Sequence, residues 1–228
     1  MEQAFKGFSP QTAEFFLQLA VNNNKAFFNA HRAVFQEFVL EPLIALARDL
    51  GSLMHSIDPE FETRPVQGKA LARLRRDTRF TKDKAPYRDN LWLGYRRPYE
   101  GNAECLGFYF DISAFGVSWG MGMYAPYRAR MDEIRRNILA RPGEFSAMVM
   151  QPSFTERFVL EGEAYKRPLV PTGDSVILDW CNRKCVAAVH DQPLDATAFS
   201  SRLGRVVEAD FKALAPIYRL LRGMPRYA

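Results

Sequence analysis

The spacing of apolar residues changes twice along the chain. In residues 10–57, and again after Pro126, apolar side chains recur three or four positions apart, which is the period of a helix. Between these regions, residues 71–123 contain short aromatic and branched runs separated by turn residues, a pattern typical of antiparallel strands. The pattern therefore predicts helices toward both ends of the chain and a sheet in the middle.

The N-terminal helical region begins at a capping sequence. Ser9 offers a capping hydroxyl and Pro10 suits the first helical position, so a helix is expected to about Val21. Residues 22–24 are three asparagines, which tolerate the end of one helix and cap the start of the next. Pro42 lies inside this second helix and is expected to kink or restart it.

Strands and helices follow in a mixed order after the first helices. The expected strands are 71–75, 91–95, 106–113, 116–123, 154–165 and 184–190. The expected helices include one after Pro126 with Met131, Ile134, Ile138 and Leu139 on one stripe, a short helix from Pro142, 174–182, and 195–221 with a bend or restart at Pro216. This order predicts one α+β domain over residues 1–228, with an antiparallel sheet from the middle of the chain packed against N-terminal and C-terminal helices.

Two glycines leave one face of the 116–123 strand almost bare. Val117, Trp119 and Met121 alternate with small residues that include Gly120 and Gly122. Glycine within a strand indicates the close approach of a backbone or of a ligand. The glycines therefore predict either close packing by a helix or a wall, free of side chains, beside a binding site.

Composition narrows the class of protein. The chain has 228 residues, of which 47% are apolar and 25% charged, which excludes disordered and fibrous classes. Three cysteines are few and odd in number, which favours a reducing compartment over a disulfide scaffold. No apolar run approaches the ~18 residues of a membrane helix, so a cytoplasmic protein without a membrane segment is expected, its oligomeric state open.

The positive charge is concentrated in one stretch. The chain carries 31 basic and 26 acidic residues, a net charge of +5. Residues 69–97 hold ten basic and three acidic residues, a local charge of +7, whereas the remainder of the chain sums to −2. The local field would steer an anionic partner to this stretch.

The basic stretch has the chemistry of an anion-binding site. Guanidinium groups bind phosphate or carboxylate through two parallel hydrogen bonds, lysines add point charge, and a tyrosine adds a hydroxyl or a stacking face. The candidate ligand-binding residues are Arg73, Arg76, Arg79, Lys82, Lys84, Tyr87 and Arg88, with Gly120 and Gly122 as the bare wall. The same spacing also fits a loop held by internal pairs such as Arg79 with Asp83, and the sequence does not separate the two.

The chain resembles a family known as domain of unknown function 2461, which comprises conserved hypothetical proteins of bacteria and fungi. The resemblance covers nearly the whole chain, and its most specific motif is the string from Arg76 to Lys84. The matching residues are Phe5–Pro10, Asn22–Lys25, Phe27-Phe28, His31-Arg32, Pro42-Leu43, Arg76–Lys84, Pro86-Tyr87, Gly107–Tyr109, Gly120–Tyr124, Pro126 and Phe211–Pro216. The resemblance implies a single cytoplasmic domain and carries no assigned activity, cofactor or catalytic residue.

Other site chemistries have weaker support. Cys181 and Cys185 lie four positions apart with His190 nearby, but zinc sites use closer cysteine pairs and four ligands, so buried thiols are expected and no metal. Nucleophile elbows and phosphate-binding glycine loops are absent from the sequence, and the cofactor stays unknown.

Four functions are compatible with these residues. The first is binding of an anionic, phosphate- or carboxylate-bearing ligand by the basic stretch. The second is an enzyme acting on a phosphorylated small molecule, with Asp77 or Asp83 beside the arginines; a lowered pKa is expected for such carboxyls. The third is weak non-specific nucleic-acid binding, with Tyr87, Trp92 and Tyr95 as stacking surfaces. The fourth is a structural or protein-binding role.

Overall fold

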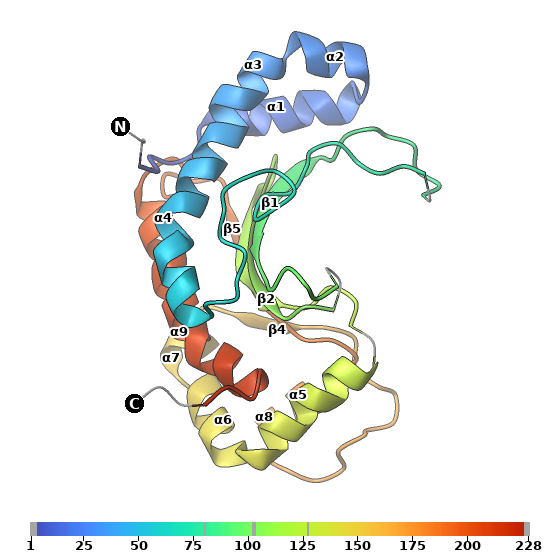
Figure 1. Cartoon of the computed structure of the whole chain (residues 1–228), viewed down its shortest axis with the longest axis vertical. Coiled ribbons are helices and arrows are strands. Elements are labelled where there is room, and N and C mark those ends of the chain that lie inside the picture. The colour runs from blue at the N-terminus through green and yellow to red at the C-terminus, as the bar shows by residue number, and fades with distance from the viewer. Residues whose placement is uncertain (1–3, 80, 102–103, 127, 226–228) are drawn as a thin grey trace. The chain divides into compact units, whose positions relative to one another are not determined.

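A five-stranded antiparallel sheet organises the chain in a computed structural model that describes residues 4–79, 81–101, 104–126 and 128–225. The strand order is β1-β2-β3-β5-β4. The strands are β1 (Asn90–Tyr95), β2 (Gly107–Ser113), β3 (Gly116–Gly122), β4 (Val159–Glu161) and β5 (Ala187–Pro193). The α+β class with helices before and after the sheet is confirmed (Figure 1).

Helices make up most of the remaining regular structure. They are α1 (Pro10–Val21), α2 (Lys25–Ala30), α3 (Arg32–Phe35), the π-helical turn η1 (Gln36–Leu40), α4 (Glu41–Ile57), α5 (Arg128–Ala140), α6 (Pro142–Val149), α7 (Pro152–Thr155), α8 (Ser175–Cys181) and α9 (Arg202–Leu221). In the described part of the chain, no helix is long and apolar enough to cross a bilayer.

Contacts divide the chain into two compact units. Unit 1 comprises residues 1–95, 109–118 and 191–208, and unit 2 comprises residues 96–108, 119–190 and 209–228. The division passes through β2, β3, β5 and α9, so these elements contribute residues to both units.

The first helices of unit 1 are joined through a proline. Pro42 has no N–H, so the carbonyl of Phe38, four residues earlier, loses its helical donor. The Thr12 hydroxyl on α1 donates to this carbonyl at 2.6 Å, and the π-helical turn η1 precedes the restart at α4. The predicted restart near Pro42 is confirmed, as are α1 from Pro10 and the helix start at Asn24, whose side chain accepts from the Phe27 N–H at 2.9 Å.

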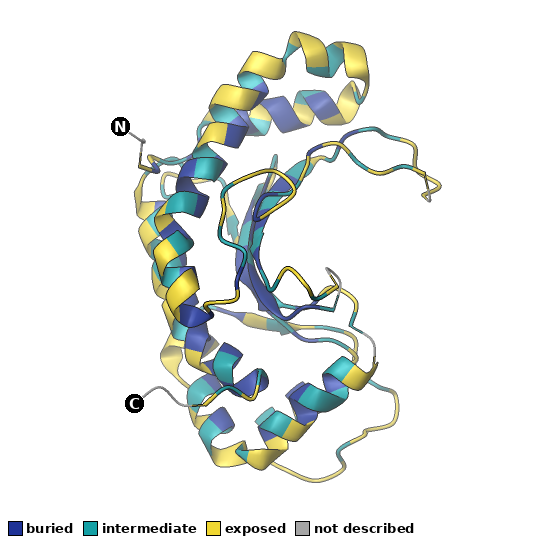
Figure 2. Ribbon diagram, viewed as in Figure 1, coloured by how far each residue is buried: buried dark blue, intermediate teal, exposed yellow. Residues whose placement is uncertain are grey.

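The core of unit 1 lies between α4 and one face of the sheet. Alternate residues of β1 are fully buried, and the Tyr95 hydroxyl donates to the carbonyl of Ala47 on α4 at 2.9 Å. Phe8 stacks on Phe110 of β2 at 5.9 Å between ring centroids. Figure 2 shows the corresponding pattern on α4, with buried residues on one side and exposed residues on the other.

The core of unit 2 forms around the C-terminal half of α9. Phe108 packs edge-on against Phe211 at 5.1 Å, and the indole N–H of Trp119 donates to the buried carboxylate of Asp210 at 2.8 Å. Arg157 also donates to Asp210, at 2.6 and 3.1 Å, so this buried charge is fully paired. The helix α9 continues through Pro216, which excludes a restart there.

Three predicted elements are wrong in their extent. Residues 71–75 form no strand of the sheet; instead residues 70–72 pair singly with the edge of β1, with the Ala72 N–H donating to Trp92 at 2.9 Å. The predicted strand 154–165 contains the end of helix α7 and only the three residues of β4. The C-terminal helix begins at Arg202, because Asp195 instead closes a turn by accepting from two backbone N–H groups.

Candidate functional site

The basic stretch folds as a two-stranded arm that extends from β1. We define the basic arm as residues 72–88, of which residue 80 lies outside the described residues. Its two lengths are held together by hydrogen bonds from the Arg76 N–H to the Pro86 carbonyl at 2.8 Å and from the Arg88 N–H to the Leu74 carbonyl at 3.0 Å. Figure 1 shows the two lengths running beside each other to a tip.

The base of the arm is anchored in the core of unit 1. Tyr87 is buried and stacks on Phe28 at 4.6 Å between ring centroids. The Asn23 side chain accepts from the backbone N–H of Tyr87 at 3.0 Å and donates to its carbonyl at 2.9 Å. Leu74 is buried as well. Tyr87 is therefore a structural residue of the arm, with its ring unavailable to a ligand.

The outer part of the arm contains internal ion pairs. Arg79 donates to both carboxylate oxygens of Asp77, at 2.9 and 2.7 Å, and Arg76 pairs with Asp83. Lys84 donates through Nζ to the Thr78 carbonyl at 2.9 Å. The hydrogen bonds from Arg79 lower the pKa of Asp77 to about 2, and those from Arg76 and the Ala85 N–H lower the pKa of Asp83. The expected lowering of both pKa values is confirmed.

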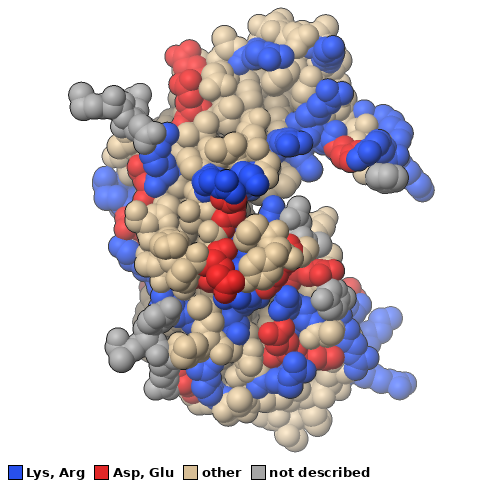
Figure 3. All heavy atoms as spheres, in the orientation of Figure 1, with Lys and Arg blue, Asp and Glu red and all other residues tan. Residues whose placement is uncertain are grey.

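Positive charge remains on the arm after these pairs are counted. Arg73, Arg75 and Lys82 are exposed, and within the described residues none of them has an acidic partner. The existing pairs are also accessible, with 76% of the Arg79 side chain and 56% of the Asp77 side chain exposed. Exposed pairs of this kind are screened by solvent and contribute little to stability, so an entering anion can compete for the same guanidinium group. Figure 3 shows the resulting surface, with Lys and Arg gathered over the arm and little acid between them.

Two of the three aromatic residues predicted to stack on nucleic-acid bases are buried. Tyr95 is fully buried, with its hydroxyl bound to α4, and Tyr87 lies beneath Phe28. Trp92 is half-buried and has the Arg88 guanidinium over its ring at 4.5 Å. The stacking surface predicted from these three residues is therefore wrong for Tyr87 and Tyr95.

Gly120 and Gly122 do not form an open wall. A Cβ built on Gly120 would lie 1.9 Å from the Ala188 carbonyl oxygen, and one on Gly122 would lie 2.6 Å from the Ala187 Cβ. Strand β5 fills this space, so the glycines permit close strand packing. Of the two interpretations offered by the sequence, close packing is correct, although a strand and not a helix makes the contact.

Cys181 and His190 take part in structural hydrogen bonds. Cys181 is buried at the end of α8, where the Arg135 guanidinium donates to its carbonyl at 2.7 Å and stabilises the helix C-terminus. Cys185 is half-buried. His190 bonds through Nδ1 to the Arg157 carbonyl at 2.6 Å and packs against Trp119. The prediction that Cys181 is a buried thiol is confirmed.

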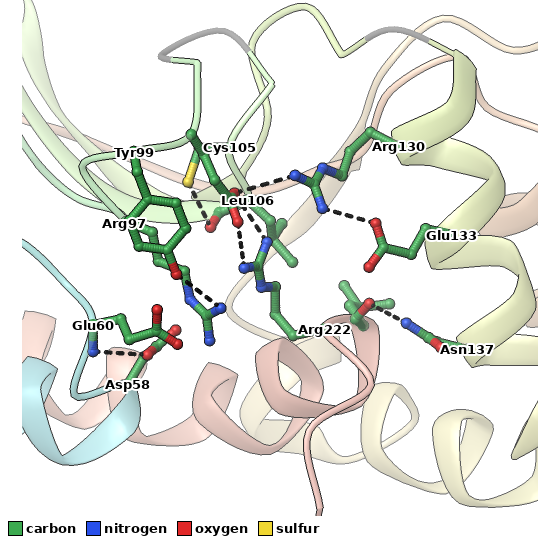
Figure 4. Close-up of polar contacts among 12 residues, drawn as sticks. Asp58, Glu60, Arg97, Tyr99, Cys105, Leu106, Arg130, Glu133, Asn137 and Arg222 are labelled. Atoms are coloured by element: carbon green, nitrogen blue, oxygen red, sulfur yellow. Dashed lines mark hydrogen bonds and ion pairs between the residues drawn. The ribbon is translucent and has the colours of Figure 1, made fainter.

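Sequence reasoning missed a charged cluster around Glu100 in unit 2. Arg222 donates to both oxygens of Glu100, at 3.0 and 2.5 Å, and Arg130 lies 3.5 Å from the same carboxylate while it also pairs with Glu133. Figure 4 shows Arg130 extending from α5 and Arg222 from the end of α9, with Cys105 nearby. Glu100 and Arg222 are 122 positions apart, and Glu100 and Arg130 are 30 apart, so no local pattern reveals the cluster.

The fold defines an α+β protein with an antiparallel sheet and a basic arm. The sequence profile of the conserved hypothetical proteins DUF2461 matches residues 11–219. The chain therefore belongs to this family, as the resemblance of its motifs predicts. A search of the curated proteins finds no significant match.

Proposed function

We propose that the protein binds an anionic ligand bearing phosphate or carboxylate through the outer part of the basic arm. The observation that carries the proposal is the surplus of exposed cations on the arm, with Lys82, Arg73 and Arg75 unpaired among the described residues. Arg76, Arg79, Lys82 and Lys84 are the proposed charge donors, with Arg73 and Arg88 as neighbouring contacts.

The internal acids of the arm support exchange with a ligand. Asp77 and Asp83 hold Arg79 and Arg76 in place through side-chain hydrogen bonds. A phosphate or carboxylate offers the guanidinium groups the same bidentate geometry. An entering anion would replace an exposed carboxylate contact and would lose little energy in doing so.

Binding fits the arm better than catalysis does. Asp77 and Asp83 keep low pKa values and so are ionised near neutral pH, which makes them poor proton donors and weak bases. The burial of Tyr87 and Tyr95 removes the stacking contacts on which the nucleic-acid alternative depends. We therefore assign Asp77 and Asp83 a positioning role toward the arginines.

Thermal unfolding of the full chain with pyrophosphate or citrate, at ionic strength matched with chloride, tests the proposal. A ligand at about a hundred times its Kd stabilises the native state by about 2.7 kcal/mol, which raises Tm by several degrees. Arg76→Ala and Lys82→Ala are expected to reduce this shift.

The matched control is Arg64→Ala. Arg64 is likewise exposed and paired with a neighbouring acid, Glu62, but lies outside the arm. This variant should keep the full shift, because phosphate also stabilises proteins non-specifically and only a site-dependent shift counts. Equal shifts in all three variants, or no shift with either anion, would overturn the proposal.

A further inference from the structure

A hollow in unit 1 lies beside the turn between β2 and β3. Its volume is about 350 Å³, and residues from β2, β3, β5 and the turn line it. We call it the hairpin pocket; its polar and aromatic lining comprises Asp111, Ser113, Phe115, Ser118, Asp191 and Gln192. The lining contains two carboxylates and no basic side chain.

Asp111 is a half-buried carboxylate without a cationic partner. The Asn90 amide donates to it at 2.6 Å, and among the described residues no Lys, Arg or His pairs with it. Burial and the negative charges of Asp89 and Asp191 together raise the pKa of Asp111 to about 7, although the Asn90 hydrogen bond opposes the rise. A positive group in the pocket would relieve this unfavourable charge.

Phe115 gives the pocket an aromatic rim. It lies in the turn between β2 and β3, and 84% of its surface is exposed. A large apolar side chain with so much exposure gains nothing from burial in the fold, whereas an aromatic ring beside an anionic pocket attracts a cation through its face.

We infer that the hairpin pocket binds a small organic cation, a primary ammonium or guanidinium group, with Asp111 as the counter-ion and Phe115 on the open side. The size of the pocket favours an organic group, because a cavity of 350 Å³ is far larger than a metal ion. Ser113, Ser118 and Gln192 offer neutral acceptors for the remaining N–H groups. This site is independent of the basic arm, which has the opposite charge.

Calorimetric titration of the full chain with agmatine, which carries both an ammonium and a guanidinium group, tests this inference. Affinity should rise about tenfold from pH 6 to pH 8, because the ionised fraction of a group with a pKa near 7 rises by that factor while agmatine stays charged. Asp111→Asn should weaken binding about tenfold or more at pH 8, as expected for loss of a charge-assisted contact. Phe115→Ala should weaken it less.

The control variant is Glu14→Gln, which removes an exposed carboxylate on α1 outside the pocket and should leave binding unchanged. Neutral butylurea, of similar size, should not bind. Agmatine binding that is equal in Asp111→Asn, an absence of agmatine binding at pH 8, or binding of Mg²⁺ in preference to agmatine would each overturn the inference.

Discussion

At the residue scale, one residue type takes opposite electrostatic roles in unit 1. Asp77 is exposed and bound by a guanidinium, so its pKa is about 2, whereas the burial of Asp111 and the charges of Asp89 and Asp191 raise its pKa to about 7. The difference arises from surroundings alone, since both are aspartates. Asp77 therefore already pairs with a cation, Arg79, whereas Asp111 has no cationic partner among the described residues.

Asp111→Asn should stabilise the protein, and more so at higher pH. A carboxyl whose pKa is raised from 3.8 to about 7 on folding contributes stability that is present below pH 3.8 and lost as the pH rises through 7. An amide keeps the shape of the side chain without this loss. We expect a gain of about 1–2 kcal/mol at pH 8 and almost none at pH 4 in urea unfolding. A gain independent of pH would contradict the role assigned to burial of the charge.

At the element scale, the packing of β3 on β5 depends on glycines. Because Gly120 has no side chain, the carbonyl of Ala188 occupies the space that a Cβ would fill. Gly122 makes room for the Cα and Cβ of Ala187 in the same way. Glycine is normally unfavourable inside a strand, so its presence at both positions reflects this approach.

Gly120→Ala should destabilise the protein by about 3 kcal/mol, because the new methyl group overlaps a backbone carbonyl that cannot move without breaking the sheet. The matched control is Gly51→Ala in α4, where an added Cβ meets nothing within 4 Å. That variant should gain about 0.5–1 kcal/mol from helix propensity. Urea unfolding measures both, and a neutral Gly120→Ala would show that the strands are less closely packed than described.

At the scale of the whole molecule, ion pairs join segments that are far apart in the sequence. In unit 2, Glu100 connects the loop before β2 to Arg130 on α5 and to Arg222 beyond α9. The Glu100 and Arg222 side chains are only 10% and 7% exposed, so each needs the other as a partner. That residues 1–228 form a single domain remains a prediction.

Glu100→Gln should destabilise the protein by about 3 kcal/mol at pH 7, because it leaves two guanidinium groups without their shared carboxylate. Burial alone would raise the pKa of Glu100, but the hydrogen bonds from Arg222 outweigh burial. The pKa of Glu100 is therefore lowered from 4.5. The stabilisation is therefore present above pH 4.5 and lost as the pH falls further, so the variant and the parent should converge in acid. Glu133→Gln, which removes the exposed partner of Arg130, should cost less than 1 kcal/mol. Equal losses in the two variants, measured by thermal or urea unfolding, would contradict the importance of Glu100.

The sequence by itself determined the features that depend on local order. Pro10 and Asn24 start helices because the fixed φ of proline and side-chain capping act within a few residues, and alternating side chains located β1, β2 and β3. The basic charge of the arm and the family motif are also readable without a fold.

The tertiary structure decided everything that depends on which distant groups meet. It brought β5 against Gly120, buried Tyr87 and Tyr95, and joined Glu100 to Arg222. It also placed Asp111 near Asp191, eighty positions away in the sequence, in a pocket that has no local signal. Burial and charge pairing depend on distances in space, and a periodicity of 2 or 3.6 residues specifies only which way a side chain faces.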